Sequence, residues 1–483
     1  MEKENLGAKV ASGLLWSLAE KILANGVSFV VSLVLARLVL PKEYGLIALI
    51  TIFVNISNVF VESGFGTALI QKKNSDDKDF HTVFIFEIGM SIVLYFILFV
   101  FSPLIADFYD EPSLVAIVRI YGVSVILGSI KNVQHSYVSK KMQFKLFFFS
   151  TVGGTLVSAV VGILMAYLGF GVWALVAQVL TNSLIDSIVL FFSIEWKPKL
   201  YFSINRLKSL YSFGWKLLAT NFLSTVYNNI YGLVIGKIYD TVSLALYNKG
   251  NSFPVLISNN VTEPIQSATF PALAYAQDDK ERLKRMTKKT LLTTTYLLWP
   301  MLIGMACIGR PMILFLITDR WSDCVIFLQI NCIATLFWPI SSTNGQLINA
   351  TGRSDVSLKL DMIKKVIGIF ILLVSIQFGI VPMAYGRCLG LFVGCIIDAY
   401  PNKAFIKYSF IEQIKDLLPN IIANLFMCIT VYGILLFKLS TLTTLIMQII
   451  TGIITYIIVS ILMKIDGYYY IKFYLKNILK NRS

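Results

Sequence analysis

The chain has 483 residues, of which 56% are hydrophobic and only 14% are charged. Average soluble domains carry about 25% charged residues, so this composition excludes a water-soluble protein and indicates a membrane protein. The net charge of +15 does not indicate nucleic-acid binding, because the basic residues stand in short clusters between apolar runs and not among base-stacking aromatic residues.

The apolar runs predict an all-α, polytopic membrane protein. A membrane-spanning helix needs about 20 mostly apolar residues, and the chain holds about 14 such runs separated by short turns such as Pro41-Lys42-Glu43. In chain order, the predicted spans are 12–38, 44–62, 82–106, 114–137, 146–168, 171–194, 211–236, 243–273, 290–309, 324–349, 360–378, 381–405, 417–437 and 441–463.

The distribution of Lys and Arg predicts the orientation of these helices. Thirty of the 42 basic residues fall in loops or at the adjoining span ends on one side of the predicted membrane, and six fall in the corresponding positions on the other side. Cytoplasmic loops carry the excess of Lys and Arg, so we predict that both termini are cytoplasmic. The predicted outer loop Asp107-Phe-Tyr-Asp110-Glu111 contains no basic residue.

A basic polar stretch at 195–210 divides six predicted helices from eight. A faint internal repeat matches Val34-Leu-Ala-Arg37-Leu to Val234-Ile-Gly-Lys237-Ile, as in transporters built from two parallel halves. The predicted domains are an N-lobe at 1–195 (helices 1–6), a cytoplasmic linker at 196–210, a C-lobe at 211–408 (helices 7–12), two further helices at 409–463, and a basic interfacial tail at 464–483.

Motifs of enzymes are absent from the sequence. It contains no GxxxxGK[ST], GxSxG or HExxH, and its six cysteines form no CxxC pair. We therefore expect that the chain is not an enzyme and that it has neither a metal site nor a cofactor. The acidic pair Asp110-Glu111 leaves one enzyme alternative, a membrane glycosyltransferase or polymerase that acts on lipid-linked sugars. The predicted outer loops, mostly under about a dozen residues, are short for that role.

Polar residues within the predicted spans are the candidates for function. Each ionised side chain costs about 2.5–3.5 kcal/mol at mid-membrane on insertion scales, so it should face a cavity or a partner. Cations suit an anionic substrate because Lys and Arg bind phosphate. Pairing between helices is the structural alternative for every one of them. The candidates for substrate binding are Lys21, Arg119, Lys216, Lys249, Gln178 and Asn349, and those for coupling to Na⁺ or H⁺ are Glu62, Asp186 and Glu263.

Several motifs, in order along nearly the whole chain, resemble one family. They are Leu35-Ala-Arg37-Leu-Val-Leu-Pro41-Lys-Glu43-Tyr44-Gly45, Glu62-Ser-Gly64-Phe-Gly66, Gly169-Phe-Gly-Val-Trp173, Phe213-Gly-Trp-Lys216, Phe270-Pro271-Ala-Leu and Asn349-Ala-Thr-Gly352-Arg353. The chain thereby resembles the bacterial polysaccharide transporters, which are Wzx-type oligosaccharide flippases of the MATE-like MOP superfamily, and especially their colanic-acid and teichuronic-acid exporters.

The resemblance implies two six-helix lobes plus two C-terminal helices in the bacterial inner (plasma) membrane. It implies that polyprenyl-diphosphate-linked oligosaccharide repeat units, of O-antigen, capsule or exopolysaccharide, are flipped to the outer leaflet by alternating access through a partly cationic central cavity. Membrane lipids, a polysaccharide polymerase and a chain-length regulator are the expected partners, and nucleic acid is not. The chain departs from the family's Tyr-x-Arg-Ala pattern at Tyr247-Asn-Lys249-Gly250. A cation-coupled small-molecule antiporter of MATE type is the main alternative.

Overall fold

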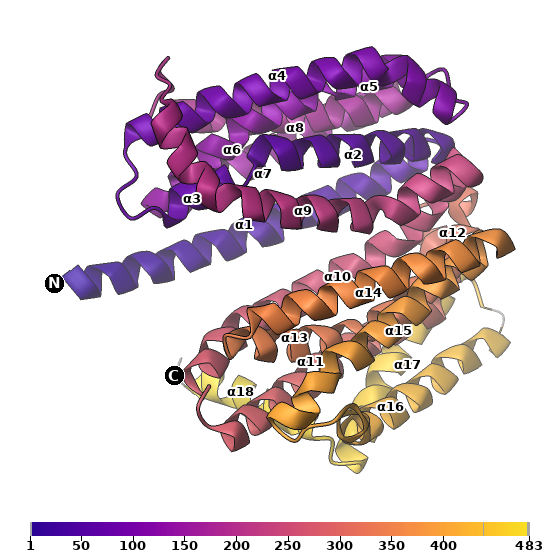
Figure 1. The fold of residues 1–483 in the computed structure, drawn as a ribbon. Helices are drawn as coiled ribbons and strands as arrows, with labels where there is room; N and C mark the ends of the chain where they lie inside the picture. The colour runs from indigo at the N-terminus through magenta and orange to yellow at the C-terminus, as the bar shows by residue number, and fades with distance from the viewer. Residues whose placement is uncertain (1, 438, 481–483) are drawn as a thin grey trace. The chain divides into compact units, whose positions relative to one another are not determined.

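The computed structural model describes residues 2–437 and 439–480 (Figure 1). Over these residues the chain is helical and contains no strand, as predicted. The contacts between residues divide the chain into two compact units, unit 1 (Met1–Ala245) and unit 2 (Leu246–Ser483).

Unit 1 is built mainly from long helices that pack side by side. Helix α7 lies between α1 and α8, and α2 contacts α6, α8 and α9. The helices of unit 1 are α1 (Glu2–Leu38), α2 (Pro41–Glu62), α3 (Phe65–Gln71), α4 (Asp77–Phe108), α5 (Leu114–Tyr121), α6 (Val123–Lys141), α7 (Phe144–Tyr167), α8 (Val172–Ser193) and α9 (Ile204–Ile238).

Unit 2 is organised around one long helix, α11, which packs against α12, α13, α16, α17 and α18. After α10 (Thr241–Tyr275), which begins at the end of unit 1, its helices are α11 (Lys280–Leu316), α12 (Cys324–Thr335), α13 (Trp338–Ala350), α14 (Ser354–Ser375), α15 (Ile380–Phe405), α16 (Phe410–Gly433), α17 (Thr441–Leu462) and α18 (Asp466–Lys480).

Eleven helical segments in the described part of the chain are long and apolar enough to cross a membrane, so the prediction of a multi-pass membrane protein is confirmed. The three other predicted spans, 211–236, 243–273 and 360–378, lie in α9, α10 and α14, which are not among those eleven. Helix α10 carries three prolines as well as the polar pair Asn259-Asn260, which lowers its hydropathy. The total of 14 spans and the cytoplasmic location of both termini stay predictions.

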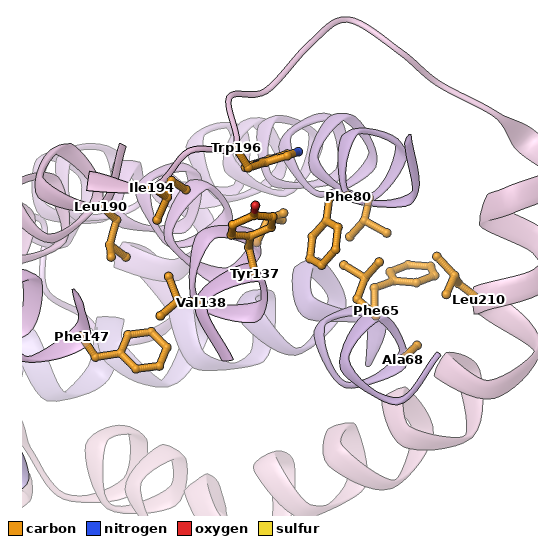
Figure 2. Close-up of a cluster of buried hydrophobic side chains, with 13 residues drawn as sticks. Phe65, Ala68, Phe80, Tyr137, Val138, Phe147, Leu190, Ile194, Trp196 and Leu210 are labelled. Atoms are coloured by element: carbon orange, nitrogen blue, oxygen red, sulfur yellow. The ribbon is translucent and has the colours of Figure 1, made fainter. Parts of the chain in front are cut away.

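The predicted linker at 196–210 is packed against unit 1. Trp196, only 4% exposed, lies in a hydrophobic cluster with Phe80, Tyr137 and Leu210 (Figure 2). Its ring stacks on those of Tyr137 and His81, with centroids 5.9 Å and 5.4 Å away. Aromatic side chains of this size bury much apolar area, so this cluster holds the polar segment in place.

Charged side chains hold the start of α9 beside the start of α4. Arg206 lies 2.5 Å from Asp76 and 2.8 Å from Asp79, which also pairs with Lys72 at 2.7 Å. Burial opposes ionisation of Asp76, but the hydrogen bonds from the backbone of Asp79 and from Arg206 lower its pKa below the ordinary value. Hydrogen bonds to Asp79 and Asp76 raise the pKa of Arg206.

The boundary between the two units lies beyond the predicted end of the N-lobe. Helix α9, the first helix of the predicted C-lobe, contacts α2, α3 and α4 and is therefore grouped with unit 1. This grouping reports contact density alone. The predicted lobes, 1–195 and 211–408, and the interfacial location of the tail at 464–483 stay predictions.

Replacing Trp196 by Ala is expected to destabilise unit 1 by about 3–5 kcal/mol, because a buried aromatic side chain is lost and a cavity remains. Thermal unfolding of the purified protein in detergent measures this loss. Leu200→Ala is the matched control, since Leu200 lies in the same segment but is fully exposed. Equal melting temperatures for the two variants would contradict the packing role of Trp196.

The 14-span prediction requires that Asp240, between α9 and α10, lies outside and that Asp278, between α10 and α11, lies inside. In a variant whose six native cysteines are replaced by Ala, Asp240→Cys should react with an impermeant maleimide in intact cells. Asp278→Cys should react only after the cells are permeabilised. Asp107→Cys, at the end of α4 and in the predicted outer loop, is the positive control. Labelling of Asp278→Cys in intact cells would refute the topology.

Candidate functional site

Unit 1 contains a polar cavity of about 360 Å³ between α2, α5, α6 and α8. The lining residues of α2 recur at helical spacing, which places Asn55, Asn58 and Glu62 on one face of the helix. The same periodicity brings Lys131, Asn132 and His135 of α6 to the cavity. The remaining lining residues are Val54, Val61, Tyr121, Ser124, Gly128, Val179 and Ser183.

An ion pair between α6 and α8 adjoins this cavity. The Nζ atom of Lys131 lies 2.7 Å from Oδ2 of Asp186, and Nε2 of His135 lies 3.4 Å from the same oxygen. Asp186 is 1% exposed. Because a buried carboxylate needs a partner that compensates for lost hydration, Asp186 neutralises the lysine that lines the cavity.

A second buried carboxylate lies behind the cavity wall. Glu87 of α4 is fully buried and accepts hydrogen bonds from Nδ2 of Asn132, at 3.0 Å to Oε1 and 2.9 Å to Oε2. These bonds orient the amide group of Asn132 in the cavity wall. Glu87 therefore positions Asn132 and does not itself line the cavity.

Unit 2 contains its own polar cavity, of about 420 Å³, between α10 and α13. Its lining consists of Glu263, Gln266, Ser267, Phe270 and Pro271 of α10 and of Gln346 of α13. The hydroxyl group of Thr269 donates a hydrogen bond to Oε1 of Gln346 at 3.3 Å, which joins the two helices.

Two cations of unit 2 are engaged in interactions within the unit. Arg387 donates from Nη1 to Tyr247, Asn251 and Asn331 at 3.2, 3.0 and 2.8 Å. Lys249, 9% exposed, places its Nζ 5.7 Å from the centroid of the Trp321 ring, a cation–π distance.

A third cation, Lys364 of α14, lies 2.9 Å from Asp398 of α15, and Asp398 also accepts a hydrogen bond from Ser341. The count of basic residues placed Lys364 at the cytoplasmic end of the predicted span 360–378, and it lies within α14. Among the described residues, no group of three or more His, Cys, Asp or Glu side chains could hold a metal ion.

The acidic pair that supports the enzyme alternative is engaged in ion pairs. Asp110 lies 3.3 Å from Lys237, and Glu111 lies 2.8 Å from Lys42. These pairs give both carboxylates a structural role in the turn between α4 and α5.

The three predicted ion-coupling residues lie at or beside the two cavities. Glu62 lines the cavity of unit 1, Asp186 lies behind Lys131 and His135, and Glu263 lines the cavity of unit 2. Coupling itself stays a prediction.

The six predicted substrate-binding residues are not brought together at these cavities. Arg119 donates to Ser102 at 3.0 Å and lies over the ring of Phe99. Lys249 is buried beside Trp321, and Gln178 packs beside Gly162. The other three are exposed, on α1, α9 and α13: Lys21, Lys216 and Asn349. None of the six is among the described residues that line either cavity, and their role in binding stays a prediction.

Sequence reasoning missed Asn55, Asn58 and His135 as site residues. The signal was present, because Asn55, Asn58 and Glu62 follow one another at intervals of three and four residues in an apolar helix. The sequence around His135 does not indicate its role, because its partner Asp186 lies on another helix.

Comparisons with known proteins identify relatives over most of the chain. Residues 34–326 match the sequence profile of the family described as "Polysaccharide biosynthesis protein". The succinoglycan biosynthesis transport protein ExoT of Rhizobium meliloti is 24% identical over 64% of this chain, and the chain spans only 62% of that protein's length. The lipopolysaccharide biosynthesis protein WzxC of Escherichia coli is 24% identical over 74% of both chains.

Another relative is the teichuronic acid biosynthesis protein TuaB of Bacillus subtilis, which is 25% identical over 63% of this chain and 64% of its own length. The resemblance stated from the motifs is thereby confirmed. ExoT is named as a transport protein, which agrees with the prediction that the chain is not an enzyme.

The fold is that of solved transporters. The lipid II flippase MurJ in an inward closed conformation superposes with a TM-score of 0.73 at 18% identity and covers 93% of this chain and 99% of its own. An inward-facing multidrug resistance transporter of the MATE family, from the MOP superfamily, gives a TM-score of 0.61 at 13% identity over 80% of this chain and 96% of its own. These likenesses show the fold alone.

Lys131→Gln should destabilise unit 1 by about 3–5 kcal/mol, because it leaves the buried carboxylate of Asp186 without its cation. The double variant Lys131→Gln/Asp186→Asn should lose much less than the sum of the two single variants. Thermal unfolding of all three proteins completes the double-mutant cycle, and simple additivity would show that the pair is not coupled. Lys141→Gln, at an exposed position on the same helix, is a control in which no buried carboxylate loses its partner.

Proposed function

Because the chain belongs to the polysaccharide biosynthesis protein family, we propose that it flips polyprenyl-diphosphate-linked oligosaccharide repeat units. Transfer runs from the cytoplasmic to the outer leaflet of the bacterial inner (plasma) membrane. The units are those of an O-antigen, a capsule or an exopolysaccharide. The family match over residues 34–326 is the observation that carries this proposal.

The physical task explains why such a protein needs a polar interior. A diphosphate and several sugars cannot enter hydrocarbon unaided, because their polar groups would lose their hydrogen bonds to water. Cavities lined by amides, hydroxyls and carboxylates, such as those of unit 1 and unit 2, offer replacement partners. The polyprenyl chain, in contrast, remains in the bilayer during transfer.

In the proposed mechanism the protein exposes a partly cationic central cavity to one side of the membrane at a time. The candidates for contact with the diphosphate are Lys21, Arg119, Lys216 and Lys249, with Gln178 and Asn349 as amide donors. Lys131 is a weaker candidate, since Asp186 already neutralises it. Helix α10, with Pro254, Pro264 and Pro271 in its interior, is suited to bending during the cycle, because proline frees backbone carbonyls.

A gradient of Na⁺ or H⁺ drives the cycle in this proposal, and its coupling carboxylates come from Glu62, Asp186 and Glu263. A polysaccharide polymerase and a chain-length regulator act on the flipped product. They are expected as functional partners and need not bind tightly.

Reconstitution tests the proposal directly. Purified protein in liposomes is given a fluorescent polyprenyl-diphosphate oligosaccharide, and an impermeant quencher reports the leaflet in which the label resides. We expect protein-dependent loss of the protected signal, faster under an imposed Na⁺ or H⁺ gradient. A substrate without the diphosphate-linked polyprenyl chain is the control and should not be flipped.

Three outcomes would overturn the proposal. Absence of flipping across several glycans and both gradients would reject it. Gradient-driven exchange of small amphiphiles in the same liposomes would favour the MATE-type antiporter. Formation of new glycosidic bonds by the purified protein would favour the glycosyltransferase or polymerase.

A further inference from the structure

One short segment occurs twice in the chain at the same internal spacing. Ile56-Ser57-Asn58 precedes Glu62 on α2, and Ile257-Ser258-Asn259 precedes Glu263 on α10. In each copy Glu follows Asn by four residues, so the two side chains lie on one face of the helix. Both serines are buried, with Ser57 6% and Ser258 4% exposed, so the two copies also share their buried face.

The segments that flank the two copies correspond as well. Each copy follows a helix that ends in a basic residue and an aliphatic one, Arg37-Leu38 in α1 and Lys237-Ile238 in α9. Each is followed by Asp-Asp-Lys where the next long helix begins, at 76–78 before α4 and at 278–280 before α11. Helices α2 and α10 therefore hold equivalent places in a repeated order of elements.

Both copies of the glutamate line a polar cavity, in unit 1 and in unit 2 respectively. The two cavities are similar in size, about 360 and 420 Å³, within the usual range for small-molecule sites. In each unit the second wall comes from the second part of a broken helix, α6 after α5 in unit 1 and α13 after α12 in unit 2.

The chemistry of the linings suits hydroxyl groups better than phosphates. The described lining of the unit 2 cavity contains a carboxylate, two amides and a hydroxyl but no cation, so it would repel a diphosphate. In unit 1 the lysine of the lining is neutralised by Asp186. Carboxylate and amide groups accept and donate the hydrogen bonds that sugar hydroxyls make. Tyr121 and Phe270 add an aromatic surface to the two linings.

Each cavity also contains a polar atom that lacks a protein partner. Within the described residues, the buried Oγ of Ser124, whose residue is 7% exposed, and Nε2 of Gln266 have no hydrogen-bond partner. Buried polar atoms are normally hydrogen-bonded, so each lining contains a residue with unused hydrogen-bonding capacity.

We propose that the two cavities are matched saccharide subsites, in which Glu62 with Asn58 on α2, and Glu263 with Gln266 on α10, bind the hydroxyl groups of one sugar residue each. This inference rests on the proposed function and names the part of the substrate that each cavity recognises. Glu62 and Glu263 accept hydrogen bonds from the sugar, so that of the three coupling candidates in the proposed cycle Asp186 alone keeps the ion-coupling role.

Binding of a lipid-free glycan tests the inference. The probe is the water-soluble oligosaccharide released by mild acid from the lipid-linked pool of the cells that produce the protein, labelled at its reducing end. Binding to purified full-length protein is followed by fluorescence anisotropy. Glu62→Gln and Glu263→Gln should each weaken binding about tenfold, since hydrogen bonds to charged groups contribute about 1.5–3 kcal/mol. Asp278→Asn, an exposed carboxylate outside the cavities, should bind like wild type.

A labelling measurement shows directly whether the sugar occupies the cavity of unit 2. Ser267→Cys, in a variant without native cysteines, should be protected from maleimide by the free oligosaccharide. Inorganic pyrophosphate should not protect it. Protection by pyrophosphate alone would overturn the inference, because it would place the diphosphate in this cavity.

The flipping assay separates failure of this inference from failure of the proposed function. Wild-type protein that flips the lipid-linked substrate but does not bind the free glycan would overturn the subsites alone. Wild-type protein that binds the glycan at these residues without flipping would overturn the function and keep the subsites. Glu62→Gln or Glu263→Gln with unchanged glycan binding but no response to an ion gradient would restore the ion-coupling role and reject the saccharide role.

Discussion

A charge buried in a low-dielectric interior must have a partner, and the helix packing of this protein depends on that constraint. Asp186 of α8 is held by Lys131 of α6, and Asp398 of α15 is held by Lys364 of α14. The first pair fixes α8, the last helix before the segment 196–210, against α6. The second pair fixes α15, the corresponding helix of unit 2, against α14. The positions of these partners therefore contribute to the packing of both units. They also decide the charge of the unit 1 cavity, because a lysine bound to an aspartate no longer attracts an anion.

This constraint changes how the charged residues are interpreted. In isolation, cations at membrane depth suggest a cationic cavity for a diphosphate. In the folded chain, several of them are engaged by their own unit, such as Arg387 by three polar partners and Arg119 by Ser102 and Phe99. What remains open at the two cavities is a surface of amides, hydroxyls and carboxylates. The polar groups there favour the sugars of a lipid-linked glycan over its phosphates.

The features that could be predicted from the sequence are those that depend on a local pattern of residues. The helical class follows from the length of the apolar runs, and the basic, aliphatic ends of α1 and α9 were recognised as a repeat. Long-range pairing could not be predicted, because Lys131 and Asp186 belong to different helices and no spacing rule connects them. The pairing of Lys364 with Asp398 was missed for the same reason, since these residues also belong to different helices. The second repeat, around Asn58 and Asn259, is visible in the sequence. It could be interpreted only once the structure showed that α2 and α10 hold equivalent places in the order of helices.

The pair between Lys131 and Asp186 also has a consequence for how the chain is made. The two residues belong to α6 and α8, with α7 between them, so during synthesis the lysine reaches the membrane before its aspartate exists. A lone charge at mid-helix is costly in lipid. The partner that offsets this cost for α6 becomes available only when α8 has been made. The contact that stabilises the folded unit is therefore also the contact that makes the charge of α6 tolerable in the membrane.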